Sequence, residues 1–417
     1  MTSPVCRSCW TPLTETFCDL GLSPMANSYV APEDLDRPEV FYPLHAYICT
    51  ECLLVQLGEF ETPEAIFSDY AYFSSYSTSW LEHARTYVEH VTRRFDIDSS
   101  TRVVEIASND GYLLQYFARN GVPVLGIEPA ANVAEVARDH GIETRVEFFG
   151  TKLAEKLVDE GRFADHLIGN NVLAHVPDLN DFVAGMKLLI AADGRITMEF
   201  PHLLRLIGET QFDTIYHEHF SYFSLHSVTR VFARHGLRLF DVEQVPTHGG
   251  SLRIYACHED ANRYAPSQRL EAVARSESDF GLDRPAGYRD FAPAVERVKR
   301  DLLSFLISAR DRGERVIAYG APAKGNTLLN YCGVGPELIE CTVDRSPHKQ
   351  GRHLPGTRLP IKAPEYIRQA KPDHVLILPW NLRDEIVRDL EYIGEWDAQF
   401  VIPIPDLETF SPGSGDQ

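Results

Sequence analysis

Short apolar runs alternate with segments of helical periodicity between residues 101 and 257. The runs are short enough for buried strands, and the segments between them, such as 111–120, have the spacing of apolar positions typical of helices. This alternation indicates an α/β fold with helices on both faces of the sheet. The pattern predicts a doubly wound sheet of about seven strands, at residues 102–107, 122–127, 144–147, 166–169, 195–200, 237–243 and 252–257.

A second alternation of helices and strands follows a polar, helix-like segment at residues 261–290. A long helix is expected over 294–312, and the later apolar runs predict a second parallel sheet. In the turn at 320–327, Lys324 precedes the second glycine, which is not the order of a phosphate-binding P-loop. Nucleotide hydrolysis is therefore poorly supported. The strands are expected at 315–319, 339–344, 374–378 and 399–404, and the tail at 411–417 is expected to be disordered.

Four of the eight cysteines form two C-x-x-C pairs near the start of the chain. Each pair can present two thiolates to one tetrahedral ion, and four sulfur ligands leave no open position for catalysis. We expect a structural zinc ion bound by Cys6, Cys9, Cys49 and Cys52. Cys18 is then a spare thiol. His45 is an alternative ligand, although a position beside the second pair without metal contact also fits it.

Composition narrows the class of protein. The 417 residues carry a formal net charge of −20, which disfavours nucleic acid as a partner. No apolar run is long enough to cross a bilayer, and the first residues lack the pattern of a secretion signal. We expect a cytoplasmic, multidomain protein that acts on small molecules. The oligomeric state stays open, with a monomer among the options.

The loop after the first strand of the central sheet is rich in carboxylates. It reads Glu-Ile-Ala-Ser-Asn-Asp-Gly, with one glycine where a dinucleotide-binding loop has three, so NAD is disfavoured. S-adenosylmethionine carries a sulfonium and an ammonium cation and no phosphate, and acidic side chains suit it. We therefore expect a class I methyltransferase fold with the donor bound by Glu105, Ser108, Asn109, Asp110 and Gly111.

Two other strand ends carry polar side chains at the same edge of the predicted sheet. Glu128 ends the second strand, where a carboxylate can accept both ribose hydroxyls of a nucleoside. Asn170 and Asn171 follow the fourth strand and are candidates for the donor pocket. Their side chains also suit the caps of the next helix, so donor binding and helix capping both remain open.

Residues 216–222, Tyr-His-Glu-His-Phe-Ser-Tyr, bring phenol, imidazole and carboxylate groups together. These are the usual general acids and bases of enzymes, although any single histidine is more often structural. We expect His217 to face the scaffold. The donor pattern upstream makes this segment a candidate active site.

The cysteine pairs, the 105–111 loop, the 170–175 loop and the Tyr216–His219 segment together resemble the sugar C-methyltransferases of deoxysugar biosynthesis. The likeness spans nearly the whole chain. It implies methyl transfer from S-adenosylmethionine to a ring carbon of a dTDP-4-keto-deoxyhexose, on the way to the branched sugars of natural products such as antibiotics. Carbon 3 is the typical position and carbon 5 the alternative.

The resemblance implies three domains: a zinc-binding domain at 1–66, a Rossmann-like methyltransferase domain at 67–260, and linker helices with a C-terminal Rossmann-like domain at 261–417. It also implies an active site. The matching residues are Tyr216, Glu218, His219, His175 and Tyr72.

A carbon–carbon bond requires a carbanion, which a ketone at carbon 4 makes accessible as an enolate. We hypothesise that His219 is the general base, because an imidazole with a pKa of about 6.5 is largely neutral near pH 7. Glu218 competes for that role or binds a sugar hydroxyl. Tyr216 and His175 are candidates for holding the enolate oxygen.

Candidate contacts to the dTDP group lie in the 320–327 turn of the second sheet or later in that domain. They are Lys324, Asn326, Arg345 and Lys349, of which the last two also fit a solvated face.

Among other functions, a small-molecule O- or N-methyltransferase is the main alternative, because such enzymes also use a histidine base. A nucleic-acid methyltransferase would need a basic groove, and a catalytically inactive binding module would need a degenerate pocket.

Overall fold

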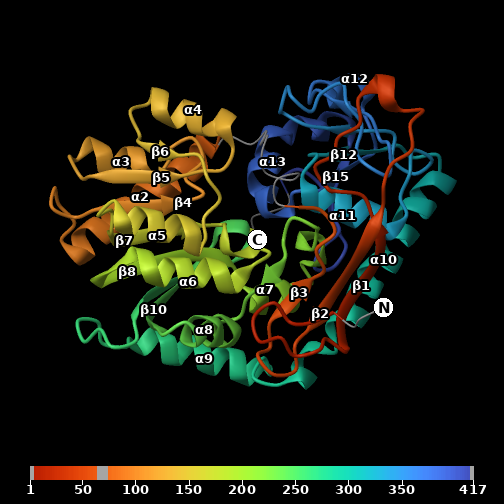
Figure 1. The fold of residues 1–417 in the computed structure, drawn as a ribbon. Helices are drawn as coiled ribbons and strands as arrows, with labels where there is room; N and C mark the ends of the chain where they lie inside the picture. Colours follow the sequence, from red (N-terminus) through yellow and green to blue (C-terminus); the bar gives the residue numbers. More distant parts are fainter. Residues whose placement is uncertain (1–3, 63–73, 414–417) are drawn as a thin grey trace. The chain divides into compact units, whose positions relative to one another are not determined.

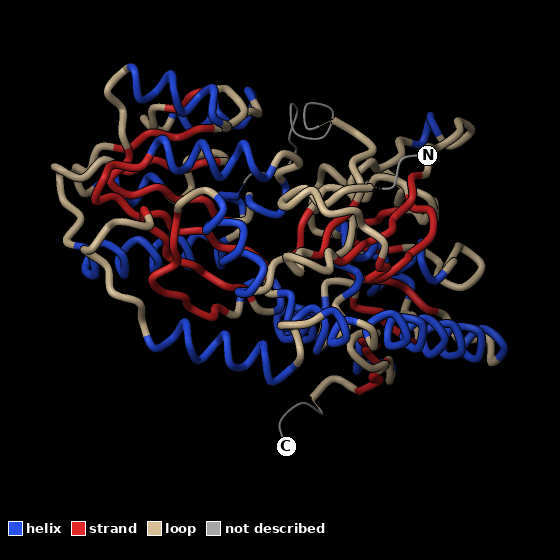
Figure 2. The backbone as a smooth tube through the Cα atoms, turned by 60° about the horizontal axis from the view of Figure 1, so that its bottom comes forward, coloured by secondary structure: helices blue, strands red, loops and turns tan. Residues whose placement is uncertain are grey.

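The computed structural model describes residues 4–62 and 74–413, and the chain divides into two compact units (Figure 1). Unit 1 comprises Met1–Thr14, Ile48–Leu203 and Phe220–Pro285, and unit 2 comprises Glu15–Tyr47, Leu204–His219 and Ala286–Gln417. Each unit contains its own α/β sheet. Figure 2 shows the strands in red and the helices in blue.

The sheet of unit 1 has seven strands in the order β10-β11-β8-β7-β4-β5-β6. The strands from β8 to β6 are parallel, and β11 and β10 complete one edge in antiparallel register. The strands are β4 (Val103–Ile106), β5 (Val124–Ile127), β6 (Thr144–Arg145), β7 (Ala164–Asn170), β8 (Ile190–Pro201), β10 (Leu237–Val245) and β11 (Ser251–His258).

Helix α2 (Thr78–Phe95) shows how the helices of unit 1 are specified. Its N-cap Ser77 accepts a hydrogen bond from the backbone of Trp80, which satisfies one of the free donors of the first turn. Residues such as Tyr87 and Val91 recur at helical spacing and are buried in the core of the sheet. The other helices are α3 (Leu114–Arg119), α4 (Ala131–Asp139), α5 (Thr151–Asp159), α6 (Leu179–Leu189), α8 (Leu225–Arg234) and α9 (Gln268–Phe280).

The two segments that contain the C-x-x-C pairs make hydrogen bonds with the rest of unit 1. Asn180 Nδ2 in α6 donates to Arg7 O at 2.7 Å, and Arg7 Nη1 donates to Pro177 O at 3.1 Å. After the second cysteine pair, β3 (Val55–Leu57) pairs in antiparallel register with β9 (Ser221–Tyr222). The first and second cysteine pairs therefore belong to the same compact unit.

A buried carboxylate of helix α9 forms hydrogen bonds with other parts of unit 1. Glu277 accepts hydrogen bonds from the backbone of Leu225 and His226 at the start of α8. Its Oε1 also lies 2.8 Å from His202 Nε2. A side chain from α9 thus satisfies the first donors of α8, as a cap does. The helical part of the 261–290 segment is an integral part of unit 1.

The sheet of unit 2 has the strand order β14-β13-β12-β15-β16-β17, with all pairs parallel except the last. Its strands are β12 (Val316–Tyr319), β13 (Thr342–Val343), β14 (Ile361–Lys362), β15 (His374–Ile377), β16 (Gln399–Ile402) and β17 (Glu408–Phe410). The helices are α7 (Leu203–Gly208), which begins at the last residue of a unit 1 segment, α10 (Phe291–Asp311), α11 (Ala323–Cys332), α12 (Tyr366–Ala370) and α13 (Arg383–Asp389).

The excursion between the cysteine pairs belongs to unit 2. It contains β1 (Glu15–Ser23) and β2 (Tyr42–Ile48), which are neighbours in a sheet. Phe17 of β1 stacks on Phe291 of α10, with ring centroids 4.6 Å apart and an interplanar angle of 8°. This aromatic contact packs β1 on the first turn of the long helix.

Every strand predicted for the central sheet is present, with shifted ends. The predicted helix at 111–120 is shorter, because it begins at Leu114, and the helix at 294–312 is α10. The second sheet is not purely parallel, since the unpredicted β17 adds an antiparallel edge strand. The domain boundaries expected from sequence stay a prediction.

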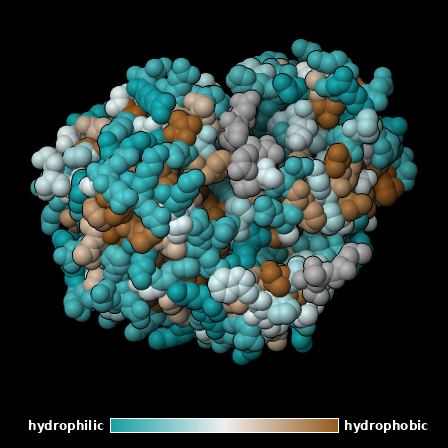
Figure 3. Space-filling model, in the orientation of Figure 1, coloured by the Kyte–Doolittle hydropathy of each residue, from teal (hydrophilic) through white to brown (hydrophobic). Residues whose placement is uncertain are grey.

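The surface is largely polar on the side drawn in Figure 3, where hydrophobic residues are scattered among hydrophilic ones. Among the residues that the structure describes, no helix is both long and apolar enough to cross a membrane.

Candidate active site

The four predicted zinc ligands lie together in unit 1. The Sγ atoms of Cys6 and Cys52 are 3.5 Å apart, those of Cys9 and Cys49 are 3.4 Å apart, and all four lie within 4.8 Å of one another. A tetrahedral zinc with bonds of about 2.3 Å would place its sulfurs about 3.8 Å apart. The four thiols fit that ion, and an all-sulfur site is structural rather than catalytic.

His45 and Cys18 do not belong to this group of ligands. His45 Nε2 lies 2.8 Å from Thr16 Oγ1 within unit 2. Burial raises the pKa of the Cys18 thiol to about 12.

At the carboxyl end of β4, Glu105 is a buried carboxyl group for which the described part of the chain supplies no neutralising partner. Its side chain is 0% exposed, and neither oxygen has a hydrogen-bond partner among the described residues. Burial raises the pKa of Glu105 well above its usual value, and the charges of Asp110 and Glu128 add to the effect. Because an unpaired buried carboxylate is costly, the site favours a ligand that brings cationic groups. S-adenosylmethionine fits this requirement.

The loop after β4 is folded tightly around these carboxylates. Glu128 accepts hydrogen bonds from the backbone of Asn109 at 3.0 Å and of Ala130 at 2.9 Å, while burial raises its pKa. Asn109 has a φ of 50° and Gly111 a φ of 78°, so the chain turns sharply at the strand end. Ser108 and Asp110 are buried in the same loop. All five loop residues predicted from sequence, and Glu128, therefore lie at one edge of the sheet.

Asn170 and Asn171 lie at the end of the neighbouring strand β7. Helix capping does not account for them, because Asp178 caps α6 and the 3-10 helix η3 (Leu173–His175) has no side-chain cap. Asn171 adopts a left-handed φ of 53° and its backbone donates to Glu199 O at 2.7 Å. His175 is the last residue of η3.

A second buried carboxylate at this edge has a full set of partners, and sequence reasoning missed it. Glu199 of β8 lies 2.9 Å from His83 Nε2 and accepts hydrogen bonds from Arg253 at 2.7 Å and Thr247 at 2.9 Å. Burial acts to raise the pKa of Glu199, but the hydrogen bond from His83 and the charge of Arg253 hold it at about 2.

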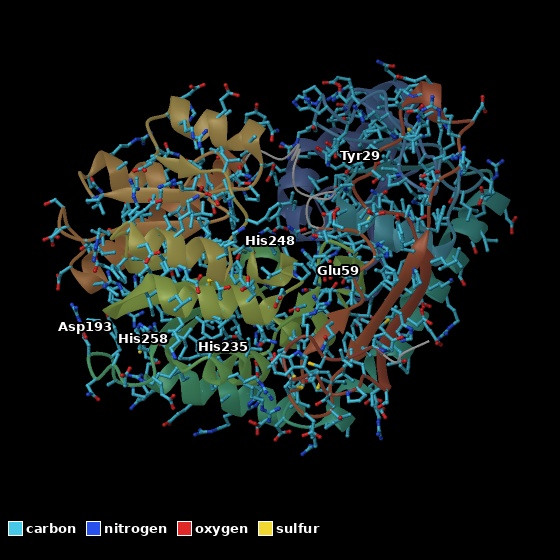
Figure 4. The ribbon with its side chains drawn as sticks, viewed as in Figure 1. Tyr29, Glu59, Asp193, His235, His248 and His258 are labelled. Carbon is cyan, nitrogen blue, oxygen red and sulfur yellow. The ribbon has the colours of Figure 1, made fainter. Side chains whose placement is uncertain are left out.

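His248, labelled in Figure 4, lies beside this group in a turn between β10 and β11. Its Nε2 is 3.2 Å from Asn171 Nδ2, and its ring centroid is 5.3 Å from that of Trp80. Its φ is 56°, in the left-handed region that non-glycine residues rarely occupy. The run Thr-His-Gly-Gly after a strand was the available sequence signal for this turn.

The predicted catalytic segment Tyr216–His219 lies in unit 2. Tyr216 Oη is 2.9 Å from His219 Nε2, and His219 Nδ1 is 2.9 Å from Thr214 O. A carbonyl oxygen only accepts hydrogen bonds, so Nδ1 carries a proton and neutral His219 has its lone pair on Nε2, facing the phenol. His217 faces the scaffold as expected, with Nε2 3.3 Å from Pro43 O.

Glu218 points to a partner that the sequence did not indicate. Asn27 Nδ2, in the excursion between the cysteine pairs, donates to both carboxylate oxygens of Glu218, at 2.9 and 2.8 Å. Burial raises the pKa of Glu218 to about 7, and the hydrogen bond from Asn27 opposes that rise. A carboxyl group with this pKa is suited to proton transfer near neutral pH.

The four candidate nucleotide contacts differ in their surroundings. Lys324 Nζ donates to Asn381 at 2.6 Å and lies 4.3 Å from the centroid of the Trp380 ring. Asn326 is buried and donates to Ala26 O at 2.6 Å. Their roles toward a substrate stay predictions.

Of the other two candidates, Lys349 Nζ donates to Ala321 O at 2.9 Å, and burial lowers its pKa. Arg345 forms ion pairs with Glu385 and, at 3.4 Å, with Asp389. This arrangement favours the solvated-face interpretation of Arg345. Tyr72 lies outside the described residues.

Three family models match consecutive parts of the chain. They are “Putative zinc binding domain” at residues 6–67, “Methyltransferase domain” at 80–242 and “C-methyltransferase C-terminal domain” at 246–405. C-methyltransferase NovU of Streptomyces niveus is 35% identical over 98% of this chain and 97% of its own length. The chain belongs to the C-methyltransferase family.

This C-methyltransferase also shows partial likenesses. A ubiquinone biosynthesis O-methyltransferase of Bartonella quintana (strain Toulouse) is 30% identical over 22% of the chain and 38% of its own length. A solved magnesium protoporphyrin IX methyltransferase from Synechocystis PCC 6803 with bound SAM is 14% identical, with a TM-score of 0.33 over 43% of the chain and 79% of its own. The PH0226 protein of Pyrococcus horikoshii OT3 is 15% identical, with a TM-score of 0.37 over 48% and 99%.

Membership of the C-methyltransferase family indicates the reaction class of this enzyme, and the sheet order of unit 1 indicates its fold class. It is an S-adenosylmethionine-dependent C-methyltransferase with a class I Rossmann-like fold and an N-terminal zinc-binding cysteine cluster. Unit 1 contains the predicted zinc ligands and the predicted donor-binding loop, and unit 2 contains Tyr216, Glu218 and His219.

Proposed function

We propose that this enzyme methylates a ring carbon, carbon 3 rather than carbon 5, of a dTDP-4-keto-deoxyhexose through an enolate, in the synthesis of a branched deoxysugar for a natural product. The observation that carries the proposal is the pair of proton acceptors in one segment of unit 2. His219 has its lone pair beside the Tyr216 phenol, and Glu218 is a buried carboxyl group with a pKa of about 7.

The chemistry requires both a base and a donor of hydrogen bonds. The base removes the proton from the carbon next to the ketone, and the electrons of that C–H bond form the enolate. A phenol or an imidazolium can donate a hydrogen bond to the enolate oxygen. When bound, S-adenosylmethionine would supply a methyl group on its sulfonium. The enolate carbon would form its new bond to that methyl as the carbon–sulfur bond breaks, which leaves S-adenosylhomocysteine as a neutral thioether and re-forms the ketone.

His219 remains our candidate for the base. The carbonyl of Thr214 holds the proton on Nδ1 and so leaves Nε2 as the acceptor. Once protonated, His219 can donate to Thr214 and to Tyr216 through its two nitrogens, which stabilises the charged form. Glu218 is the competing base, and its pKa of about 7 supports that role. Tyr216 and His175 are the candidates for the enolate oxygen.

The remaining roles follow from charge and position. The buried carboxylates Glu105 and Glu128 support binding of the cationic donor and its ribose. Lys324 and Lys349 are proposed to bind the diphosphate, because burial lowers their pKa and so favours pairing with an anion. Arg345 has two carboxylate partners already, which weakens its case.

The proposed function can be tested by incubating the purified enzyme in deuterated water with S-adenosylmethionine and a panel of dTDP-4-keto-deoxyhexoses. NMR would follow proton exchange next to the ketone and new carbon-bound methyl signals. Exchange together with a methyl group on carbon 3 is the expected result. Donor consumption without any carbon-bound methyl would exclude these sugars as acceptors.

Single turnovers of variants then assign the base. We expect His219→Asn to slow methyl transfer by about 100-fold or more while donor binding persists, because a positioned base contributes about 10²- to 10⁴-fold. His348→Asn, an exposed histidine of the same unit, is the control. Near-normal transfer by His219→Asn together with loss of transfer in Glu218→Gln would move the base to Glu218.

A further inference from the structure

The loop at residues 26–29 is fixed to the start of α11 on both sides of Asn27. Before it, Ala26 O accepts a hydrogen bond from Asn326 Nδ2 at 2.6 Å. After it, Tyr29 Oη donates to Ala321 O at 2.6 Å (Tyr29 is labelled in Figure 4). One hydrogen bond from α11 and one to the turn just before it leave the intervening residue little freedom. The position of the Asn27 side chain is therefore set by the fold of unit 2.

The Asn27 amide makes a two-oxygen contact with a buried acid. Its Nδ2 lies 2.9 Å from Oε1 and 2.8 Å from Oε2 of Glu218, a residue 191 positions away in sequence. Glu218 is 7% exposed, whereas Asn27 is exposed. An N–H group that donates to a carboxylate stabilises its charged form.

We propose that Asn27 is a positioning residue, whose amide orients the Glu218 carboxylate and favours its charged form. The role of this contact in catalysis rests on the proposed function, whereas the contact itself is independent of that function.

The surroundings of Glu218 contain other groups that titrate. Tyr216 and His219 belong to its own segment, and Tyr29 lies in the same loop as Asn27. Tyr29 is itself near a cation, since Lys349 Nζ is 5.2 Å from its ring centroid. Burial raises the pKa of Tyr29, and the charges of Asp344 and Glu218 raise it further. Tyr29 therefore stays a neutral phenol while Glu218 titrates.

A direct titration of Glu218 tests the proposal without any substrate. Carbon-13 NMR of the side-chain carboxyl, assigned with Glu218→Gln, should show a midpoint near pH 7 in the wild-type enzyme. In Asn27→Leu, a replacement of similar size without a donor, the midpoint should move about one pH unit higher. Ser28→Ala in the same loop is the matched control and should leave it in place. An unchanged midpoint in Asn27→Leu would overturn the proposal.

If Asn27→Leu does not fold, Asn27→Asp provides the same test. It keeps the shape of the side chain and places a second negative charge beside Glu218, which should also move the midpoint to higher pH. A midpoint unaffected by that charge would show that the two side chains do not meet.

The kinetic measurement is the rate of proton exchange next to the ketone as a function of pH. Glu218 acts as a carboxylate in either of its proposed roles, as the base or as the group that binds a sugar hydroxyl while His219 is the base. Exchange should therefore rise with pH through the Glu218 pKa, and that rise should shift upward with the NMR midpoint in Asn27→Leu. A shift from about 7 to about 8 corresponds to roughly fivefold slower exchange at pH 7.

A shifted NMR midpoint with an unchanged exchange profile would reduce the contact to a structural one and overturn the positioning role. If the wild-type enzyme exchanges no proton in any of the sugars, the proposed function fails. The NMR titration would still decide whether Asn27 controls Glu218.

Discussion

Two carboxyl groups at the edge of the unit 1 sheet are equally buried and differ in their partners. Glu199 is surrounded by Arg253, His83 and Thr247, and its pKa is held at about 2. Glu105 has no such partners among the described residues, and its pKa is raised. The first arrangement is complete within the described residues, whereas a cationic ligand such as the methyl donor would complete the second.

The unpaired state of Glu105 gives a prediction for Glu105→Gln. Removing the charge should weaken binding of S-adenosylmethionine by about tenfold or more, because a hydrogen bond to a charged group contributes about 1.5–3 kcal/mol. The ligand-free protein should be as stable as the wild type or more so, since the variant no longer buries an ionisable group without a partner. Calorimetric titration and denaturant unfolding measure the two effects.

The control for this experiment is Glu155→Gln, which removes an equal charge from an exposed position on α5. It should change neither donor affinity nor stability by a measurable amount. Equal donor affinity in Glu105→Gln and the wild type would contradict the role given to Glu105.

At the scale of elements, most strands and the long helix α10 were predictable from apolar runs and periodicity, whereas two short edge strands of the second sheet were not. The apolar runs of the central sheet appear as strands, because a strand covered on both faces is buried along its whole length, as β4 is, and has a continuous apolar sequence. Strands β14 and β17 have two and three residues, too few for a pattern to emerge. The loop with Asn27 was read only as an excursion, since its partner lies 191 residues away.

The donor loop and β5 are packed closely enough that one methyl group should disturb both. A Cβ atom at Gly126 would overlap the hydroxyl of Ser108 and lie 3.2 Å from Thr144 Oγ1. We expect Gly126→Ala to lower the free energy of unfolding by about 1–3 kcal/mol through overpacking. Donor affinity should fall as well, because Ser108 lies in the loop after β4.

The double variant Gly126→Ala/Ser108→Ala tests the cause of this effect. Removing the hydroxyl should restore part of the lost stability, so the two substitutions should be non-additive in a denaturant-unfolding cycle. Additive losses would show that the glycine matters for another reason.

At the scale of the whole molecule, the sequence predicted which local motifs form the candidate site, but it did not predict the contacts between residues far apart in the chain. Sequence spacing indicated the four cysteines, the acidic loop and the Tyr216–His219 segment, because each is a local motif. It did not indicate Glu199, His248 or Asn27, whose partners come from distant parts of the chain. Contacts of that kind arise only when the fold brings strand ends and loops together.

The cysteine cluster predicts how the protein depends on metal. We expect one zinc ion per chain, and Cys52→Ser should lose it, because three thiolates bind zinc more weakly than four. The variant should also unfold at lower temperature than the wild type. Cys18→Ser, which alters a buried cysteine outside the cluster, is the control and should retain the ion. Elemental analysis and thermal unfolding measure both; full zinc content in Cys52→Ser would exclude the site.

The interleaved course of the chain decides what truncation or recombination can do to this enzyme. Unit 2 is assembled from Glu15–Tyr47, Leu204–His219 and Ala286–Gln417, so a fragment that starts at residue 286 lacks both Asn27 and the Tyr216–His219 segment. Exchanging unit 2 between two related enzymes would require three gene segments to be replaced together. Selectivity carried by this unit should therefore be inherited as a linked set of segments.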